Sequence, residues 1–247
     1  MSAAFERIRP WAVVNAAGYV RVDEAELNEE RCRRENTTGA QLLAQASSRR
    51  GLRLLCFSSD LVFDGRSSRP YCEGDGVAPL SAYGRSKADA EVLVQAACSH
   101  ALIVRTSAFF GPWDQANAVH HALTAFAAGR RWRVPSDQRV SPTYVPDLVN
   151  VALDLLIDGA NGIWHLANDG DVSWSELARK VALATGYSNH LVENCLTEEL
   201  GCAAARPIYS VLGTDRGQRL PSLDDALARF VAERDRQIRR PSRGTAA

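Results

Sequence analysis

The fold is decided by residues 52–60, which read LRLLCFSSD. A short apolar run of this kind is typical of a strand buried in a parallel sheet. Small or acidic side chains follow it at Ser58, Ser59 and Asp60. Because parallel α/β sheets carry their chemistry at the carboxyl ends of the strands, we expect functional side chains at these three positions.

The same pattern repeats on both sides of this strand. Further strands are predicted at residues 12–17, 101–105 and 162–166, and helices at 24–50, 81–99, 116–128, 144–156, 173–185 and 224–236. Strands that alternate with long helices favour an α/β fold with a parallel sheet and right-handed crossovers. The predicted strand ends are all rich in small or polar residues, at 15–18, 58–60, 105–107 and 166–168.

Composition excludes several classes of protein. The 247 residues carry 29 basic and 29 acidic side chains, so no overall charge is available to attract nucleic acid or an anionic membrane. No apolar stretch approaches the roughly 20 residues that span a bilayer, and residues 1–7 lack the apolar segment of a secretory signal. The six cysteines form no Cys-x-x-Cys pair, and we expect reduced thiols in a cytoplasmic protein without a metal site.

A candidate catalytic group begins the helix predicted at 81–99. Tyr83 and Lys87 are four residues apart and therefore share one face of the helix. An ammonium group near a phenol favours the phenolate, which suits Tyr83 to proton transfer near neutral pH. Ser59 ends the preceding strand, and its hydroxyl is expected to hydrogen-bond the same substrate oxygen. The three residues predict reduction of a carbonyl group, with hydride from a nicotinamide and the proton from Tyr83.

A hydrolase is the alternative reading of the same strand ends. It would use Ser59, Asp60 and His165, but the chain has no Gly-x-Ser-x-Gly elbow. His165 lies inside a predicted strand, and we expect it to be a buried histidine of the core.

Several motifs follow one another along the chain. They are Asn-Ala-Ala at 15–17, Val-Asp-x-Ala-Glu at 22–26, Ser-Ser-Asp-x-Val-Phe-x-Gly at 58–65, Pro-x-x-x-Tyr-Gly-x-x-Lys at 79–87, Arg-Thr-Ser at 105–107, Asp-Gln-x-x-x-Pro-Thr at 137–143 and Ala-Arg-Pro at 205–207. This series resembles the extended short-chain dehydrogenase/reductases and, within them, the dTDP-4-dehydrorhamnose reductases. The resemblance covers residues 9–234, and Asn36 matches the helix asparagine of the family.

The resemblance implies a reductase of 4-keto nucleotide sugars that uses NADPH or NADH, and it implies roles for single residues. Tyr83 is the acid, Lys87 tunes it and holds the nicotinamide ribose, and Ser59 orients the carbonyl group. Cofactor contacts are implied for Asn15, Ala16, Ala17, Ser58, Tyr83, Lys87, Thr106 and Ser107. Substrate contacts are implied for Asp60, Gln138, Pro142, Thr143 and Arg206.

The chain departs from the family pattern in its glycines. None of the 17 glycines forms the Gly-x-x-Gly-x-x-Gly turn that brings the backbone close to a dinucleotide pyrophosphate. We therefore expect a Rossmann-like sheet truncated at its N-terminus, without the first two strands and first helix of the family, about 50 to 60 residues. Leu61 stands where the family often has tyrosine and Ala108 where it has tryptophan, and both changes concern the identity of the sugar.

The predicted organisation has two parts and a tail. Residues 1–112 and 144–168 form the remainder of a Rossmann-like nucleotide-binding domain, 113–143 and 169–236 a small C-terminal substrate lobe, and 237–247 a disordered tail. Two functions stay open: a reductase of deoxysugar biosynthesis, alone or within a longer or fused protein, and a non-catalytic sugar-nucleotide-binding or regulatory module. The expected partners are the nucleotide sugar and a fused domain, a partner chain or a second copy.

Overall fold

The computed structural model describes residues 2–239 and has a four-stranded sheet at its centre. The strand order is β1 (Ala12–Asn15), β2 (Arg53–Ser59), β3 (Leu102–Thr106) and β8 (Gly162–His165). All three pairings are parallel, so the predicted strands and the predicted α/β sheet are confirmed. The register places Cys56 beside Asn15 and Ser59 beside Thr106, and the functional strand ends therefore meet at one edge.

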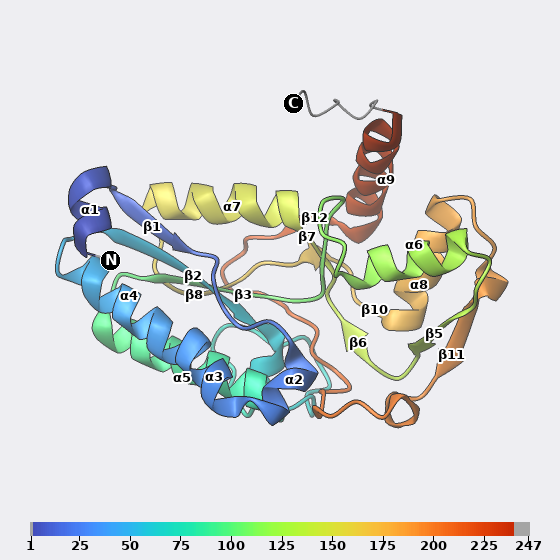
Figure 1. Ribbon diagram of the computed structural model, residues 1–247, viewed down its shortest axis with the longest axis horizontal. Helices are drawn as coiled ribbons and strands as arrows, with labels where there is room; N and C mark the ends of the chain where they lie inside the picture. Colours follow the sequence, from blue (N-terminus) through green and yellow to red (C-terminus); the bar gives the residue numbers. More distant parts are fainter. Residues whose placement is uncertain (1, 240–247) are drawn as a thin grey trace, which may run out of the picture.

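Helices cover both faces of this sheet (Figure 1). α7 (Val145–Asp158) lies on one face, and α4 (Gly39–Ser48) and α5 (Ala82–Ala97) lie on the other. Strand β2 shows why both faces need a helical cover, because successive side chains of a strand point to opposite faces. Leu54 packs among residues of α4 and α5, whereas the next residue, Leu55, packs against α7.

A second group of elements lies to one side of the sheet (Figure 1). Its helices α6 (Ala118–Ala127), α8 (Trp174–Ala184) and α9 (Leu223–Arg239) enclose a core of their own, which includes Phe126 and Phe230. Short strands complete the molecule: β4 (Phe109–Phe110), β5 (Trp132–Pro135), β6 (Arg139–Val140), β7 (Thr143–Tyr144), β9 (Asn168–Asp169), β10 (Val172–Ser173), β11 (Val192–Cys195) and β12 (Leu220–Ser222). This separate core supports the predicted second lobe, whose boundaries stay a prediction.

The helix predicted at 24–50 is broken in the structure. α2 (Val22–Leu27) is followed by α3 (Glu29–Arg33), and a π-helical turn at Arg34–Thr38 then leads into α4. A π-helical turn adds a residue to one turn of helix and is frequent at functional sites. Here it turns Asn36 inward, where 3% of its surface is exposed.

Two further differences concern the ends of the described chain. α1 (Ser2–Ile8) was not predicted, because a helix this short carries little periodic signal. α9 extends to Arg239 and therefore includes the first residues of the tail predicted at 237–247, while 240–247 lie outside the described residues. Between residues 2 and 239, no helix is both long and apolar enough to cross a membrane.

Candidate active site

A cleft of about 310 Å³ opens at the carboxyl ends of β1 and β2. Six of the predicted site residues line it: Asn15, Ala16, Ala17, Ser58, Tyr83 and Lys87. Apolar side chains from β4 and α7 form much of the opposite wall, namely Phe109, Val145, Leu148 and Val149, and Gly18, Val20 and Phe57 complete the lining. The three residues of α7 were missed, because their pattern is that of ordinary core packing.

Tyr83 stands in the first turn of α5, where two features of the local sequence place it. The Ser81 hydroxyl accepts a hydrogen bond of 3.1 Å from the Gly84 N–H and so caps the helix. Gly84 allows a close approach to the chain that follows β2, since a Cβ atom there would lie 2.3 Å from the Leu61 carbonyl oxygen. The start of α5 is therefore held against the end of β2, beside Ser59.

The electrostatic surroundings of Tyr83 combine Lys87 with the buried Asp60. Lys87 Nζ lies 5.7 Å from the centre of the Tyr83 ring and donates a hydrogen bond of 3.2 Å to the Phe57 carbonyl oxygen. Burial and the nearby Asp60 carboxylate raise the pKa of Tyr83, and the Ser59 hydroxyl opposes them only in part. Burial also lowers the pKa of Lys87. Tyr83 thus stays protonated at neutral pH, which is the state that a proton donor needs.

Asp60 organises the hydroxyl groups at the end of β2. Its side chain is buried and accepts hydrogen bonds from Ser59 at 3.1 Å, Ser107 at 2.8 Å and Ser210 at 2.6 Å. Burial raises the pKa of Asp60, while these three donors favour the carboxylate. Ser210 was not predicted, since it belongs to none of the motifs and approaches Asp60 only in the folded chain.

Buried polar groups without hydrogen-bond partners among the described residues indicate whether a nicotinamide nucleotide fits this site. The buried hydroxyls of Ser58 and Thr106 have no hydrogen-bond partner within residues 2–239, and Ser58 lines the cleft. A buried hydroxyl without a partner costs free energy that a polar ligand group can recover. The small side chains at 16–18 leave the backbone accessible beside them. These residues therefore fit the ribose and carboxamide of a nicotinamide.

Asn36 fixes the loop that forms one wall of the cleft. Its side chain accepts a hydrogen bond of 2.8 Å from the Tyr19 N–H and donates to the Tyr19 carbonyl oxygen and to the Ser86 hydroxyl at 3.0 and 2.9 Å. A Cβ atom on Gly18 would lie 2.7 Å from Asn36 Oδ1 and 3.8 Å from Lys87 Nζ. A larger residue at this point would therefore require the Asn36 side chain to shift.

The residues predicted to contact substrate lie outside this cleft in the described part of the chain. They are Asp60, Gln138, Pro142, Thr143 and Arg206. Gln138 is buried, and its Nε2 atom has no hydrogen-bond partner among residues 2–239. Arg206 forms a two-pronged ion pair with Asp23, with N···O distances of 3.0 and 2.7 Å. Their substrate contacts stay predictions.

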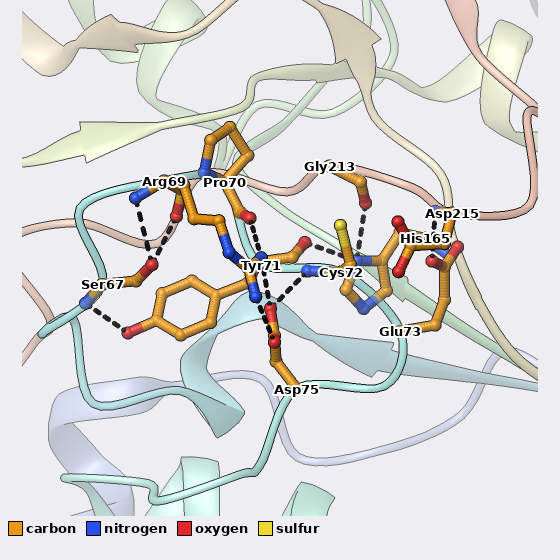
Figure 2. A network of polar contacts seen from close by, with 10 residues as sticks. All are labelled: Ser67, Arg69, Pro70, Tyr71, Cys72, Glu73, Asp75, His165, Gly213 and Asp215. Carbon is orange, nitrogen blue, oxygen red and sulfur yellow. Dashed lines mark hydrogen bonds and ion pairs between the residues drawn. The ribbon is translucent and has the colours of Figure 1, made fainter.

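His165 belongs to a separate polar network, which Figure 2 shows. The ring is buried, as predicted, and its Nδ1 atom lies 3.0 Å from the Tyr71 carbonyl oxygen and 2.9 Å from that of Gly213. Nδ1 must therefore carry the proton, and Nε2 accepts from Arg105 at 3.4 Å. Both ring nitrogens are in use, so none is available to activate Ser59 as the hydrolase reading requires.

The same network holds the loop at 67–75 in place. Glu73 accepts hydrogen bonds from the backbone N–H groups of His165 and Asp215, and Arg69 pairs with Asp75 at 2.7 Å (Figure 2). These contacts join the loop to strand β8 and to the chain near Gly213. We assign them a structural role.

Comparison with known proteins shows a family relationship over nearly the whole chain. Residues 1–234 match the family model described as RmlD substrate binding domain. A dTDP-4-dehydrorhamnose reductase from Mycobacterium tuberculosis is 40% identical over 222 residues, which cover 86% of this chain and 72% of that protein. The spore coat polysaccharide biosynthesis protein SpsK from Bacillus subtilis is 33% identical over 235 residues, 94% of this chain and 82% of that protein.

A solved structure extends the comparison to three dimensions. The crystal structure of a dTDP-4-dehydrorhamnose reductase from Bacillus anthracis in complex with NADP superposes with a TM-score of 0.89 at 33% sequence identity. The alignment covers 94% of this chain and 83% of that one.

Proposed function

The chain belongs to the RmlD substrate binding domain family, and from this premise we propose that it reduces a keto group of a nucleotide sugar with hydride from NADPH or NADH. The substrate class is a 4-keto-6-deoxyhexose carried on dTDP, as the names of the related reductases indicate. One observation carries the proposal: Tyr83, Lys87 and Ser58 line a single cleft at the carboxyl ends of two neighbouring parallel strands.

The cofactor supplies the hydride when it is bound. Ser58 and Lys87 would hold its nicotinamide ribose, and the backbone at residues 15–17 would lie along it. The Ser58 hydroxyl, which has no hydrogen-bond partner among the described residues, supports this assignment. Thr106 ends the neighbouring strand β3 and Ser107 follows it, and we assign both to the border of the same group.

Tyr83 is the proton donor of the proposed reaction. It gives its phenolic proton to the carbonyl oxygen, and the Lys87 ammonium group stabilises the phenolate that remains. Ser59 donates to Asp60 in this structure and is close enough to Tyr83 to influence its pKa. We therefore assign Ser59 to orientation of the carbonyl group, and Asp60 to orientation of Ser59.

The substrate side of the site is proposed at Gln138, Pro142, Thr143 and Arg206. Gln138 offers a buried donor without a partner among the described residues, which is the feature expected of a group that awaits a ligand. Thr143 is fully buried and donates to the Ser141 carbonyl oxygen, so its contribution is to shape the turn.

Replacement of Tyr83 tests the proposed function. Purified protein with NADPH and a dTDP-4-keto-6-deoxyhexose should consume the dihydronicotinamide, and Tyr83→Phe should lower kcat by about a hundredfold or more, the usual contribution of a general acid. Tyr187→Phe is the matched control, because Tyr187 packs against the core of the second group of elements. Binding of dTDP without any turnover in the unaltered protein would contradict the proposal and favour the non-catalytic alternative.

Compartment and partners belong to the same proposal. The six cysteines are free thiols, which suits the reducing cytoplasm. Within residues 2–239, strand β1 pairs with β2 alone, and a strand edge of this kind is normally covered. We propose that a fused domain, a partner chain or a second copy covers it, and light scattering of the purified chain would detect the last of these.

A further inference from the structure

Helix α2 carries two carboxylates that bind two distant parts of the chain. Both belong to the Val-Asp-x-Ala-Glu motif at 22–26, to which the proposed reaction gives no role. Glu26 reaches the start of α5, and Asp23 reaches the segment at 204–206. Between them, Ala25 is completely buried and packs in one cluster with Ala82 and Tyr83. The helix therefore rests directly on the first turn of α5.

Glu26 caps the catalytic helix from outside. Its Oε1 atom accepts a hydrogen bond of 2.7 Å from the backbone N–H of Ala82, the first residue of α5. The first N–H groups of a helix have no partner within the helix, so an acceptor from elsewhere both satisfies this group and fixes the helix start. Tyr83 is the next residue, and it lies between the N–H held by Glu26 and the N–H that Ser81 caps.

Asp23 holds the segment at 204–206 to the same helix. Its carboxylate accepts from the Ala204 N–H at 3.0 Å and from two nitrogens of Arg206. Arg206 also donates to the Ala204 carbonyl oxygen at 3.0 Å, so the guanidinium group is fixed on two sides. Because both hydrogen bonds of such a bidentate pair are directional, the pair fixes the orientation of the guanidinium group.

The chain beyond Arg206 leads back to the carboxylate network of the site. Pro207 packs against Gly65: a Cβ atom added to Gly65 would lie 2.7 Å from the Pro207 side chain. Ser210 then donates to Asp60 at 2.6 Å. The segment is therefore held at both ends, by Asp23 at Ala204 and Arg206 and by Asp60 at Ser210.

We propose that Glu26 and Asp23 are positioning residues for the reduction, Glu26 for Tyr83 and Asp23 for Arg206 and the segment that follows it. The proposal rests on the proposed function, because Tyr83 and Arg206 have their roles only there. The two carboxylates act on different quantities. Glu26 governs the placement of the proton donor and so governs kcat, whereas Asp23 governs the side that binds the nucleotide sugar and so governs KM.

Substitution of Glu26 tests the first half. Glu26→Ala removes the acceptor and should lower kcat by roughly ten- to hundredfold, with KM within about threefold, because a small misplacement of a reacting group has this effect. Glu26→Gln keeps an oxygen acceptor for the Ala82 N–H and should restore most of kcat. Glu29→Ala is the matched control, since Glu29 also contacts α5, through an exposed pair with Arg85 at 3.4 Å. It should change neither constant.

Substitution of Asp23 tests the second half. Asp23→Asn removes the charge that directs Arg206 and should raise KM for the nucleotide sugar by roughly tenfold, with kcat within about threefold. Binding of dTDP itself, measured by calorimetry, should weaken in parallel. An equal fall of kcat in the Asp23 and Glu26 variants would show a merely structural role and overturn the proposal.

Hydrogen exchange separates this proposal from the proposed function. In Glu26→Ala the amides at 82–84 should exchange faster than in the unaltered protein, while Glu26→Gln and Glu29→Ala should leave their exchange unchanged. This measurement needs no turnover. An unaltered protein that reduces no nucleotide sugar would refute the proposed function alone, whereas unchanged exchange in Glu26→Ala would refute the role of Glu26 alone.

Discussion

Gly84→Ala is the sharpest single test of how the fold places Tyr83. An added Cβ atom would lie 2.3 Å from the Leu61 carbonyl oxygen and 2.9 Å from Pro79 Cβ, whereas ordinary contacts begin near 3.4 Å. The backbone of Gly84 is helical, so the effect of alanine is steric and not conformational. Because the atom it meets is a backbone oxygen, the start of α5 must move by about 1 Å.

The size of the effect follows from this displacement. Overpacking of this type costs about 1–3 kcal/mol, and the better helix propensity of alanine returns at most about 1 kcal/mol. We therefore expect the free energy of unfolding to fall by about 1–2 kcal/mol. Tyr83 moves with the helix away from Ser59, and a shift of about 1 Å can lower kcat by up to a hundredfold.

Urea denaturation and steady-state kinetics measure the two effects separately. Gly74→Ala provides the control, because a Cβ atom there would meet no atom within 4 Å and its backbone is not left-handed. It should leave both the denaturation midpoint and kcat unchanged. A Gly84→Ala protein that unfolds at the midpoint of the control and keeps its kcat would refute the reasoning, since it would mean that the contact with Leu61 does not set the position of α5.

Three further predictions concern charged groups. Arg105→Met should cost about 3–5 kcal/mol in urea denaturation, because it leaves Glu91 buried without its partner, whereas the double variant with Glu91→Leu should recover part of that loss. The pair with Arg206 holds the pKa of Asp23 below its usual value of 3.8. The ion pair should therefore stabilise the folded protein fully above about pH 4, and this stabilisation should be lost as the pH falls further. The difference in unfolding free energy between the unaltered protein and Asp23→Asn should accordingly disappear at low pH. Asp60→Asn removes a charge that raises the pKa of Tyr83, the proposed proton donor, and the alkaline limb of the kcat profile should move to lower pH; an unmoved limb would contradict this assignment.

The sheet could be predicted from the sequence because its strands are strongly patterned. Apolar runs such as 52–57 end in small polar residues, and long helical patterns separate them. The broken helix at 24–50 could not be predicted, since the π-helical turn at Arg34–Thr38 arises from the bonds that Asn36 makes to a distant loop and to α5. The pattern of apolar residues does not predict such long-range hydrogen bonds.

Part of the site could likewise be predicted from the sequence, and part could not. The sequence predicted six of the residues that line the cleft, because each stands at a strand end or on the first turns of one helix. They are residues 15–17, Ser58, Tyr83 and Lys87. The contacts of Asp60 with Ser210 and of Glu26 with Ala82 join residues 150 and 56 positions apart, and no local pattern indicates which polar groups will meet. Such pairings are decided by tertiary packing, which brings buried donors and acceptors together because an unpaired one is costly.

The charged groups around Tyr83 include one that the sequence did not indicate. The spacing of Tyr83 and Lys87 indicated one charged neighbour of the phenol, and no local pattern indicated Asp60, which stands at the end of another element. In the fold, burial and the Asp60 charge raise the pKa of Tyr83 and so favour the protonated phenol. A reductase needs its tyrosine protonated before hydride transfer and needs the phenolate stabilised afterwards. In the proposed reaction, Asp60 would serve the first requirement and Lys87 the second, so the two charges would act on Tyr83 in opposite senses at different stages.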